Sequence, residues 1–218
     1  MDYAVFVGEE KTLIYKKGQG IVLNEPSITV HSEGNKVISV GKSAMKFNQQ
    51  GSNIIVQPVV KHGCIQSIDN AGIFLAQMFK KIGRINNCLV CIPSSLDSNG
   101  LNLYKDAVYS AASSDVAIVF IPQVIANAIA QGYNIESTEL VLSTVVEGDS
   151  ADLAVIRSGE IIDGGTLSGL KKFDEAKNRL LRTYPKIKHL HGSRINVING
   201  AGKLLANDSL IRKIVELN

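Results

Sequence analysis

The strongest constraint on the fold is a plan of strand, turn and strand that occurs twice along the chain. The first copy opens with residues 3–7, a continuous apolar run typical of a strand covered on both faces. The second copy has an apolar run at 139–146, the turn Glu147-Gly148-Asp149-Ser150, and another apolar run at 151–156. A chain that repeats its own plan is expected to contain two related halves.

Residues 12–27 are the most distinctive stretch of the first copy. Leu13, Ile14 and Tyr15 lead into the charged, glycine-containing tip Lys16-Lys17-Gly18, and a second apolar run ends at Pro26. This pattern predicts a β-hairpin. Before it lies the turn Gly8-Glu9-Glu10-Lys11. Such a turn between strands can point backbone N–H groups at an anion, although this one carries two carboxylates.

The remaining pattern alternates between helix and strand, which predicts an α/β sheet with helices packed over it. Ser67 is the expected cap of the first helix. The other expected elements are a second hairpin at 28–30 and 37–40, a short helix at 44–47, an extended connector at 53–60, strands at 88–93 and 116–121, helices at 103–113, 123–129 and 173–184, a loop at 186–193, and a strand, glycine turn and helix start from 194.

Composition excludes several classes of protein. Hydrophobic residues make up 45% of the chain and charged residues 20%, as in ordinary globular proteins. The net charge of +3 comes from scattered lysines, so we expect no nucleic-acid partner. Cys88 and Cys91 lie in an apolar run, which favours a buried strand over a metal or redox site. The odd number of cysteines fits a reducing cytosol.

The chain has no apolar stretch of the roughly 20 residues that a membrane span needs. We therefore expect a cytoplasmic protein, and leave open peripheral contact with the inner face of the membrane or with a cell-shape complex. His189 and His191 could bind a metal if their segment formed a strand. Since no third ligand lies nearby in the sequence, a surface loop is the preferred interpretation.

Residues 12–27 resemble the amino-terminal segment of the MreB-type bacterial actins, the rod shape-determining family. There an Asp-Leu-Gly-Thr-Ala-Asn-Thr phosphate loop precedes Leu-Ile-Tyr, a basic tip and Gly-Ile-Val-Leu-Asn-Glu-Pro-Ser. The resemblance implies an α/β, actin-like (ribonuclease H-like) duplicated fold whose two halves flank a nucleotide cleft. It places the first half at 1–135, with a small inserted subdomain at about 28–62, and a shortened second half at 136–218 that has lost most of its own subdomain.

The resemblance also assigns nucleotide-contact positions, which we expect to be vestigial. The glycines and hydroxyl that match the family's loops are Gly8, Thr12, Gly148, Gly200 and Gly202. The last two fall where the family has Leu-Thr-Gly-Gly-Gly-Ser-Leu-Leu on the adenosine side. The family's metal-side carboxylates are replaced by Phe6 and Val145, and its Glu-Glu-Pro segment by Pro122 and Gln123, neither of which can act as a base.

Acidic side chains stand instead in the loops that should hold phosphate: Glu9, Glu10, Glu147 and Asp149. Like charges about 4 Å apart repel by roughly 4 kcal/mol at an effective dielectric constant of 20. A few such contacts cancel a micromolar affinity, which corresponds to about 8 kcal/mol. We therefore predict no catalytic residue, no metal site and no bound ATP.

The predicted function is that of an MreB-like cytoskeletal scaffold, a pseudo-actin that associates with itself or with a full-length bacterial actin. The alternative is a divergent actin-like ATPase that still binds ATP with magnesium and polymerises. A sugar-kinase or chaperone relative is a weaker third interpretation, because residues 12–27 match the shape-determining filaments.

Overall fold

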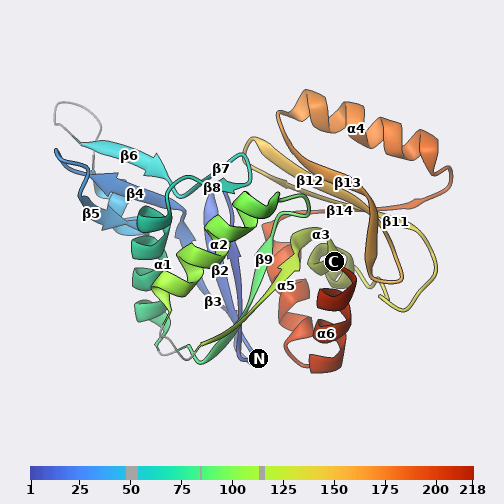
Figure 1. The fold of residues 1–218 in the computed structure, drawn as a ribbon, viewed down its shortest axis with the longest axis horizontal. Coiled ribbons are helices and arrows are strands. Elements are labelled where there is room, and N and C mark those ends of the chain that lie inside the picture. The colour runs from blue at the N-terminus through green and yellow to red at the C-terminus, as the bar shows by residue number, and fades with distance from the viewer. Residues whose placement is uncertain (48–53, 84, 113–115) are drawn as a thin grey trace.

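Two β-sheets flank a central pair of helices in the computed structural model, which describes residues 1–47, 54–83, 85–112 and 116–218 (Figure 1). The first half contains β1 (Tyr3–Val7), β2 (Lys11–Lys16), β3 (Gly20–Pro26), α1 (Ile68–Ile82), β9 (Asn87–Ile92), α2 (Ser98–Ala111), β10 (Ala117–Pro122) and α3 (Gln123–Ala130). The second half contains β11 (Val141–Glu147), β12 (Ser150–Arg157), β13 (Glu160–Ser168), α4 (Leu170–Thr183), β14 (Lys188–Gly192), α5 (Arg194–Leu204) and α6 (Asp208–Leu217).

A small three-stranded sheet projects from the first half at the upper left of Figure 1. Its elements and the short hairpin after it are β4 (Ile28–His31), β5 (Val37–Val40), the 3-10 helix η1 (Gly41–Lys46), β6 (Ile55–Pro58), β7 (Val60–Lys61) and β8 (Cys64–Ile65). The predicted hairpin and short helix are present here. The predicted connector begins at Asn53, outside the described residues.

The two large sheets repeat one topology. In each, three consecutive strands pair antiparallel and a later strand returns parallel to the first, as β9 does with β1 and β14 does with β11. The strand orders are β10-β9-β1-β2-β3 and β13-β12-β11-β14. The second sheet therefore has one strand fewer than the first. The predicted duplicated α/β fold with a shortened second half is confirmed.

The largest core lies between the sheets and is built around α3 and α5. Phe6 and Leu89 of the first sheet, and Val145 and Leu190 of the second, pack against these helices from opposite sides. On the outer faces, α1 and α2 cover the first sheet with a second extensive cluster, and α4 covers the second sheet with a smaller one. The resulting order is helices, sheet, helices, sheet, helix.

Two predictions for the end of the chain were wrong. Residues 188–192, expected in a loop, form β14, and the segment from Arg194, expected to be a strand, begins helix α5. The strand-to-helix step therefore falls at Ser193, whose backbone N–H donates to Asn196 Oδ1 at 3.1 Å. A polar residue before the helix and an amide three residues later form a capping pattern, which the apolar residues of 194–198 concealed.

The second helix of the first half also differs from its prediction. It was expected at 103–113, but α2 begins at Ser98, because Asp97 caps its first turn by accepting a hydrogen bond from the Gly100 N–H at 2.7 Å. Ser113, the expected end of this helix, lies outside the described residues. The cysteine run behaves as predicted: Cys88 and Cys91 are buried in β9, and burial raises the pKa of the Cys88 thiol to about 12.

Candidate functional site

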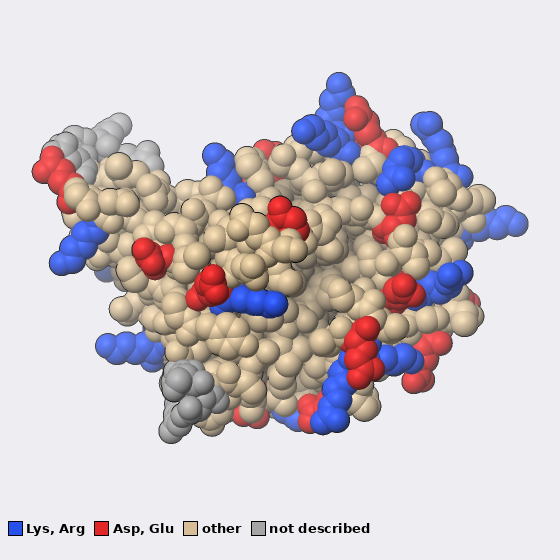
Figure 2. Space-filling model, in the orientation of Figure 1, with Lys and Arg blue, Asp and Glu red and all other residues tan. Residues whose placement is uncertain are grey.

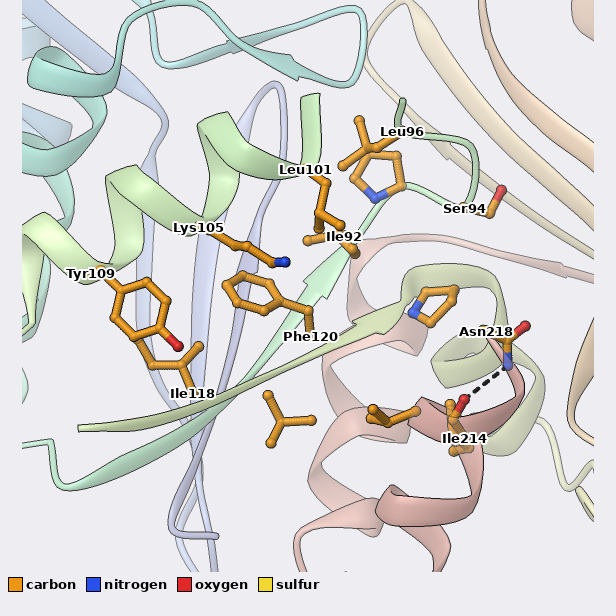
Figure 3. A pocket seen from close by; sticks show the side chains of 14 residues that line it. Ile92, Ser94, Leu96, Leu101, Lys105, Tyr109, Ile118, Phe120, Ile214 and Asn218 are labelled. Carbon is orange, nitrogen blue, oxygen red and sulfur yellow. Dashed lines mark hydrogen bonds between the residues drawn. The ribbon is translucent and has the colours of Figure 1, made fainter. Parts of the chain in front are cut away.

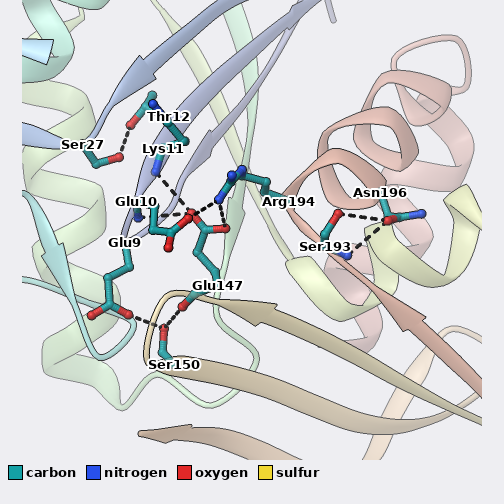
Figure 4. A network of polar contacts seen from close by, with 10 residues as sticks. All are labelled: Glu9, Glu10, Lys11, Thr12, Ser27, Glu147, Ser150, Ser193, Arg194 and Asn196. Carbon is teal, nitrogen blue, oxygen red and sulfur yellow. Dashed lines mark hydrogen bonds and ion pairs between the residues drawn. The ribbon is translucent and has the colours of Figure 1, made fainter. Parts of the chain in front are cut away.

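The turns that open the two halves meet each other (Figure 4). The turn between β1 and β2 carries Glu9 and Glu10, and the turn between β11 and β12 carries Gly148 in the left-handed region at φ 58°. Ser150 Oγ donates to Glu9 Oε2 at 2.8 Å, and a Cβ on Gly148 would lie 3.1 Å from the same oxygen. The turns therefore touch each other directly.

Glu147 makes the central contact between these turns. Its side chain is largely buried, and its Oε1 accepts the backbone N–H groups of Glu10 at 3.1 Å and Lys11 at 3.2 Å. Two successive N–H groups aimed at one oxygen form the type of anion site expected for this turn. The anion they hold is a carboxylate of the chain itself.

Arg194, the first residue of α5, closes the arrangement. Its Nη1 lies 2.6 Å from Glu10 Oε2 and 3.1 Å from Glu147 Oε2, so one guanidinium bridges both turns. Burial raises the pKa of Glu147, while Arg194 and the two N–H groups act in the opposite direction. Burial alone would lower the pKa of Arg194, but the two carboxylates raise it. We call Glu9, Glu10, Glu147, Ser150 and Arg194 the carboxylate clamp.

Gly8 and Thr12, which match the family's first phosphate loop, are both in close contact with other protein residues. A Cβ on Gly8 would lie 2.5 Å from the Phe6 ring and 2.7 Å from Glu147 Oε1, so only glycine fits beside the clamp. Thr12 is fully buried in β2, and its hydroxyl lies 2.9 Å from Ser27 Oγ. The structure brings Gly8 and Gly148 to the clamp and turns the Thr12 side chain into the protein.

Gly200 and Gly202 lie elsewhere, inside helix α5. A Cβ on Gly200 would approach the Ala126 carbonyl oxygen of α3 to 1.7 Å, and one on Gly202 would approach the Tyr15 ring to 2.7 Å. Both glycines therefore allow close packing of α5, Gly200 against a helix and Gly202 against the first sheet. The nucleotide role that the resemblance gives them stays a prediction, and their contacts here are with protein atoms.

A buried carboxylate also joins the two halves. Asp152 of β12 is fully buried, and its Oδ2 accepts the Ser94 backbone N–H at 2.9 Å. Its Oδ1 accepts the hydroxyl of Ser94 and, at 3.1 Å, that of Thr166. Burial raises the pKa of Asp152 to about 6, against the hydrogen bonds from Ser94, Gln123 and Thr166.

Sequence reasoning gave no role to Asp152, Ser94 or Arg194. For Arg194 the capping pattern at Ser193 was a usable signal, because it places a cation at the start of a helix. For Asp152 the signal was an acid inside a mainly apolar strand pattern, where an unpaired buried charge is costly.

The donors and acceptors of the clamp largely satisfy one another. The N–H groups of Glu10 and Lys11 are engaged by Glu147, and the carboxylates of Glu10 and Glu147 are engaged by Arg194. Within the described residues, no group of three or more His, Cys, Asp or Glu side chains is arranged to hold a metal ion. As arranged, these residues do not fit a magnesium-bound triphosphate, since the site presents carboxylates where phosphate oxygens require donors.

A separate apolar groove of about 390 Å³ opens between α2, β10 and α6 (Figure 3). Leu101 and Phe120 line it from the first half and Val215 from the second, with Lys105 and Tyr109 along one side. It is distinct from the carboxylate clamp. Its walls come from both halves, so its shape depends on how α6 packs beside β10.

The surface charge is dispersed over most of the face in Figure 2, with Lys and Arg side chains gathered at the upper right, where Figure 1 has α4. Among the described residues, no helix combines the length and the apolar composition needed to cross a membrane.

Comparison with known proteins places this architecture in a family. The family profile described as MreB/Mbl protein matches residues 1–188. The cell shape-determining protein Mbl of Bacillus subtilis (strain 168) is 29% identical over 195 residues, which cover 84% of this chain and 57% of that protein. The cell shape-determining protein MreB of Escherichia coli (strain K12) is 27% identical, covering 88% of this chain and 61% of that protein.

Solved structures agree on the fold. MreB5 of Spiroplasma citri bound to ADP superposes with a TM-score of 0.67 at 23% identity, covering 84% of this chain and 57% of that one. The same protein bound to AMPPNP gives 0.65 at 22% identity, covering 94% and 62%. This chain thus spans about three fifths of the length of these relatives. With the profile matching most of its length, the chain belongs to the MreB/Mbl family.

Proposed function

We propose that this chain is an MreB-like cytoskeletal scaffold, a pseudo-actin whose cleft is occupied by its own carboxylate clamp. It keeps the frame of the family and works through surfaces, either by self-association or by co-assembly with a full-length bacterial actin. The role in cell shape rests on the relatives, which are described as cell shape-determining proteins.

One observation carries the proposal. Glu147 Oε1 lies 3.1 and 3.2 Å from two consecutive N–H groups in the turn that the family resemblance assigns to phosphate. An internal carboxylate competes at an effective concentration far above that of a dissolved ligand, because it is already held in place. A phosphate entering the turn would have to displace Glu147 and break its ion pair with Arg194.

Assembly without nucleotide is the direct consequence. The test is sedimentation of the purified protein alone and with a full-length MreB, each with and without ATP and magnesium. We expect the chain to pellet, alone or with its partner, to the same extent in both conditions. Soluble monomers in every condition would contradict a cytoskeletal role, and assembly that required ATP would contradict the closed cleft.

The alternative is a divergent ATPase in which the clamp opens to admit ATP and magnesium. The specific support for it is that similar structures of MreB5 contain ADP or AMPPNP. Phosphate release measured in excess ATP distinguishes the two functions. A steady rate above background that Glu147→Gln abolishes would favour the ATPase, whereas no release from the natural chain would favour the scaffold.

A further inference from the structure

The outer face of the second sheet is only partly covered. Helix α4 packs on β12 and β13, while β14 is the edge strand beyond β11. The first half has two helices on the corresponding face, and the second half has one. The edge strand β14 is therefore where polar side chains of this face stay exposed.

Two histidines occupy this uncovered side. Successive residues of a strand point to opposite faces, so His189 and His191 share one face of β14 while Leu190 enters the central core. Their register partners on β11 are Leu142 and Thr144, and Leu142 belongs to the cluster under α4. Both histidines are exposed, and their ring centroids are 6.1 Å apart.

The two imidazoles converge on a single atom. His189 Nε2 lies 2.9 Å from Thr144 Oγ1, and His191 Nδ1 lies 3.0 Å from the same oxygen. A hydroxyl has one proton to donate, so one ring nitrogen accepts it and the other donates its own N–H to the oxygen. Two ring nitrogens are thus held within about 3 Å of one atom, on the same face of the strand.

We propose that His189 and His191 form a two-histidine site for a divalent transition metal ion such as Zn²⁺ or Ni²⁺, with its other coordination positions open to water. Imidazole nitrogen suits these ions, and Zn–N bonds are about 2.0–2.1 Å long, so the nitrogens would leave the Thr144 hydroxyl to bind the metal. No third His, Cys, Asp or Glu joins the pair among the described residues, which makes the site exchangeable rather than structural.

The surrounding charges set the strength of this site. Lys177 of α4 acts electrostatically on His189, so its positive charge opposes a bound cation, although its Nζ is paired with Asp174 Oδ1 at 3.0 Å. Lys188, which directly precedes His189 in β14, adds a second positive charge near the site. A Lys177→Gln variant should therefore bind the metal more tightly.

The experiment is calorimetric titration with Zn²⁺ at pH 7.5. It uses the full chain in a Cys64→Ser background, since Cys64 is an exposed thiol and thiolates are zinc ligands. We expect one zinc ion per chain, and at least tenfold weaker binding in His189→Ala and in His191→Ala, because each substitution destroys the chelate. His62→Ala removes the exposed histidine of the first half and should leave the affinity unchanged.

Imidazole ¹⁵N NMR of the unsubstituted chain gives a second readout that does not depend on how the variants fold. Zinc should shift the resonances of His189 and His191 together and leave those of His31 and His62 in place. Equal affinity in the double variant His189→Ala/His191→Ala, shifts at only one of the two rings, or no binding at millimolar zinc would each overturn the site.

Discussion

The first half covers the outer face of its sheet with two helices, α1 and α2, whereas the second half uses α4 alone. Both halves place the helix after their last strand, α3 or α5, in the shared core between the sheets. The common core preserves the duplicated plan, and the outer layer is where the halves have diverged. The family frame therefore depends on the inner helices, while the thinner outer layer of the second half leaves polar side chains such as His189 exposed.

The largest expected effect contrasts the two outer layers. Phe74 of α1 is fully buried in the extensive cluster, and replacing such a ring with alanine costs about 4 kcal/mol. Phe173 of α4 is also buried, but its cluster is small, so Phe173→Ala should release α4 locally at a cost of about 3 kcal/mol.

Urea unfolding and amide hydrogen exchange of the two variants measure this contrast. We expect Phe74→Ala to reduce protection throughout the first half, and Phe173→Ala to reduce it mainly in α4. Loss of protection over the whole molecule in Phe173→Ala would show that the outer layers are equally important.

The second expected effect is a pH dependence that comes from Asp152. Its pKa is raised from 3.8 to about 6, so its favourable contribution to folding is fully present below about pH 4 and is lost as the pH rises through 6. At about 1.4 kcal/mol for each unit of pKa, the loss is about 3 kcal/mol. Urea unfolding of the natural chain and of Asp152→Asn at pH 4, 5, 6 and 7 tests it. As the pH rises, the natural chain should lose stability relative to Asp152→Asn. A difference in stability that stays constant from pH 4 to 7 would contradict the raised pKa of Asp152.

A third contrast concerns how α5 joins the halves. Gly200→Ala places a methyl group against the α3 backbone, which cannot move easily, and should destabilise the protein by about 2 kcal/mol despite the better helix propensity of alanine. Gly202→Ala meets only the Tyr15 ring, so its cost should be about 1 kcal/mol or less. Thermal unfolding of the two variants compares them directly, and a larger loss in Gly202→Ala would reverse the account of α5.

The smallest expected effect is that of the clamp cation. Arg194→Ala leaves Glu147 buried without its ion pair, but Arg194 is partly exposed, so the loss of stability should be about 1 kcal/mol. Arg179→Ala is the matched control, because Arg179 pairs with Asp163 at the surface and its removal should have no measurable effect. Equal losses in the two variants by urea unfolding would mean that the clamp does not hold the halves together.

Most of the fold could be predicted because it follows from local pattern. The apolar runs at β1, β9, β11 and β12 and the helical period after Ser67 each specify their element without distant information. β14 could not be found this way: it is a short edge strand whose sequence, Lys-His-Leu-His-Gly, buries one large apolar side chain, Leu190. Because β14 was not predicted, the start of helix α5 at Arg194 was predicted to be the strand instead.

The site was less predictable, because its contacts join residues far apart in the chain. The positions of the acids Glu9, Glu10 and Glu147 could be predicted from the sequence, but the groups that bind their carboxylates could not. Arg194 is 184 residues from Glu10 and 47 from Glu147 along the chain. The expectation of simple repulsion was therefore incomplete: the acids are held by a guanidinium and by backbone N–H groups, so they fill the turn in a stable form.

The central claim is that Glu147 occupies the anion site of the first turn, and titration calorimetry with Mg-ATP tests it most directly. We predict no binding by the natural chain at nucleotide concentrations up to the millimolar range. We predict weak binding only in Glu147→Ala, which frees the Glu10 and Lys11 N–H groups, and none in the matched Asp149→Ala variant. Low-micromolar binding of Mg-ATP by the natural chain would contradict the account.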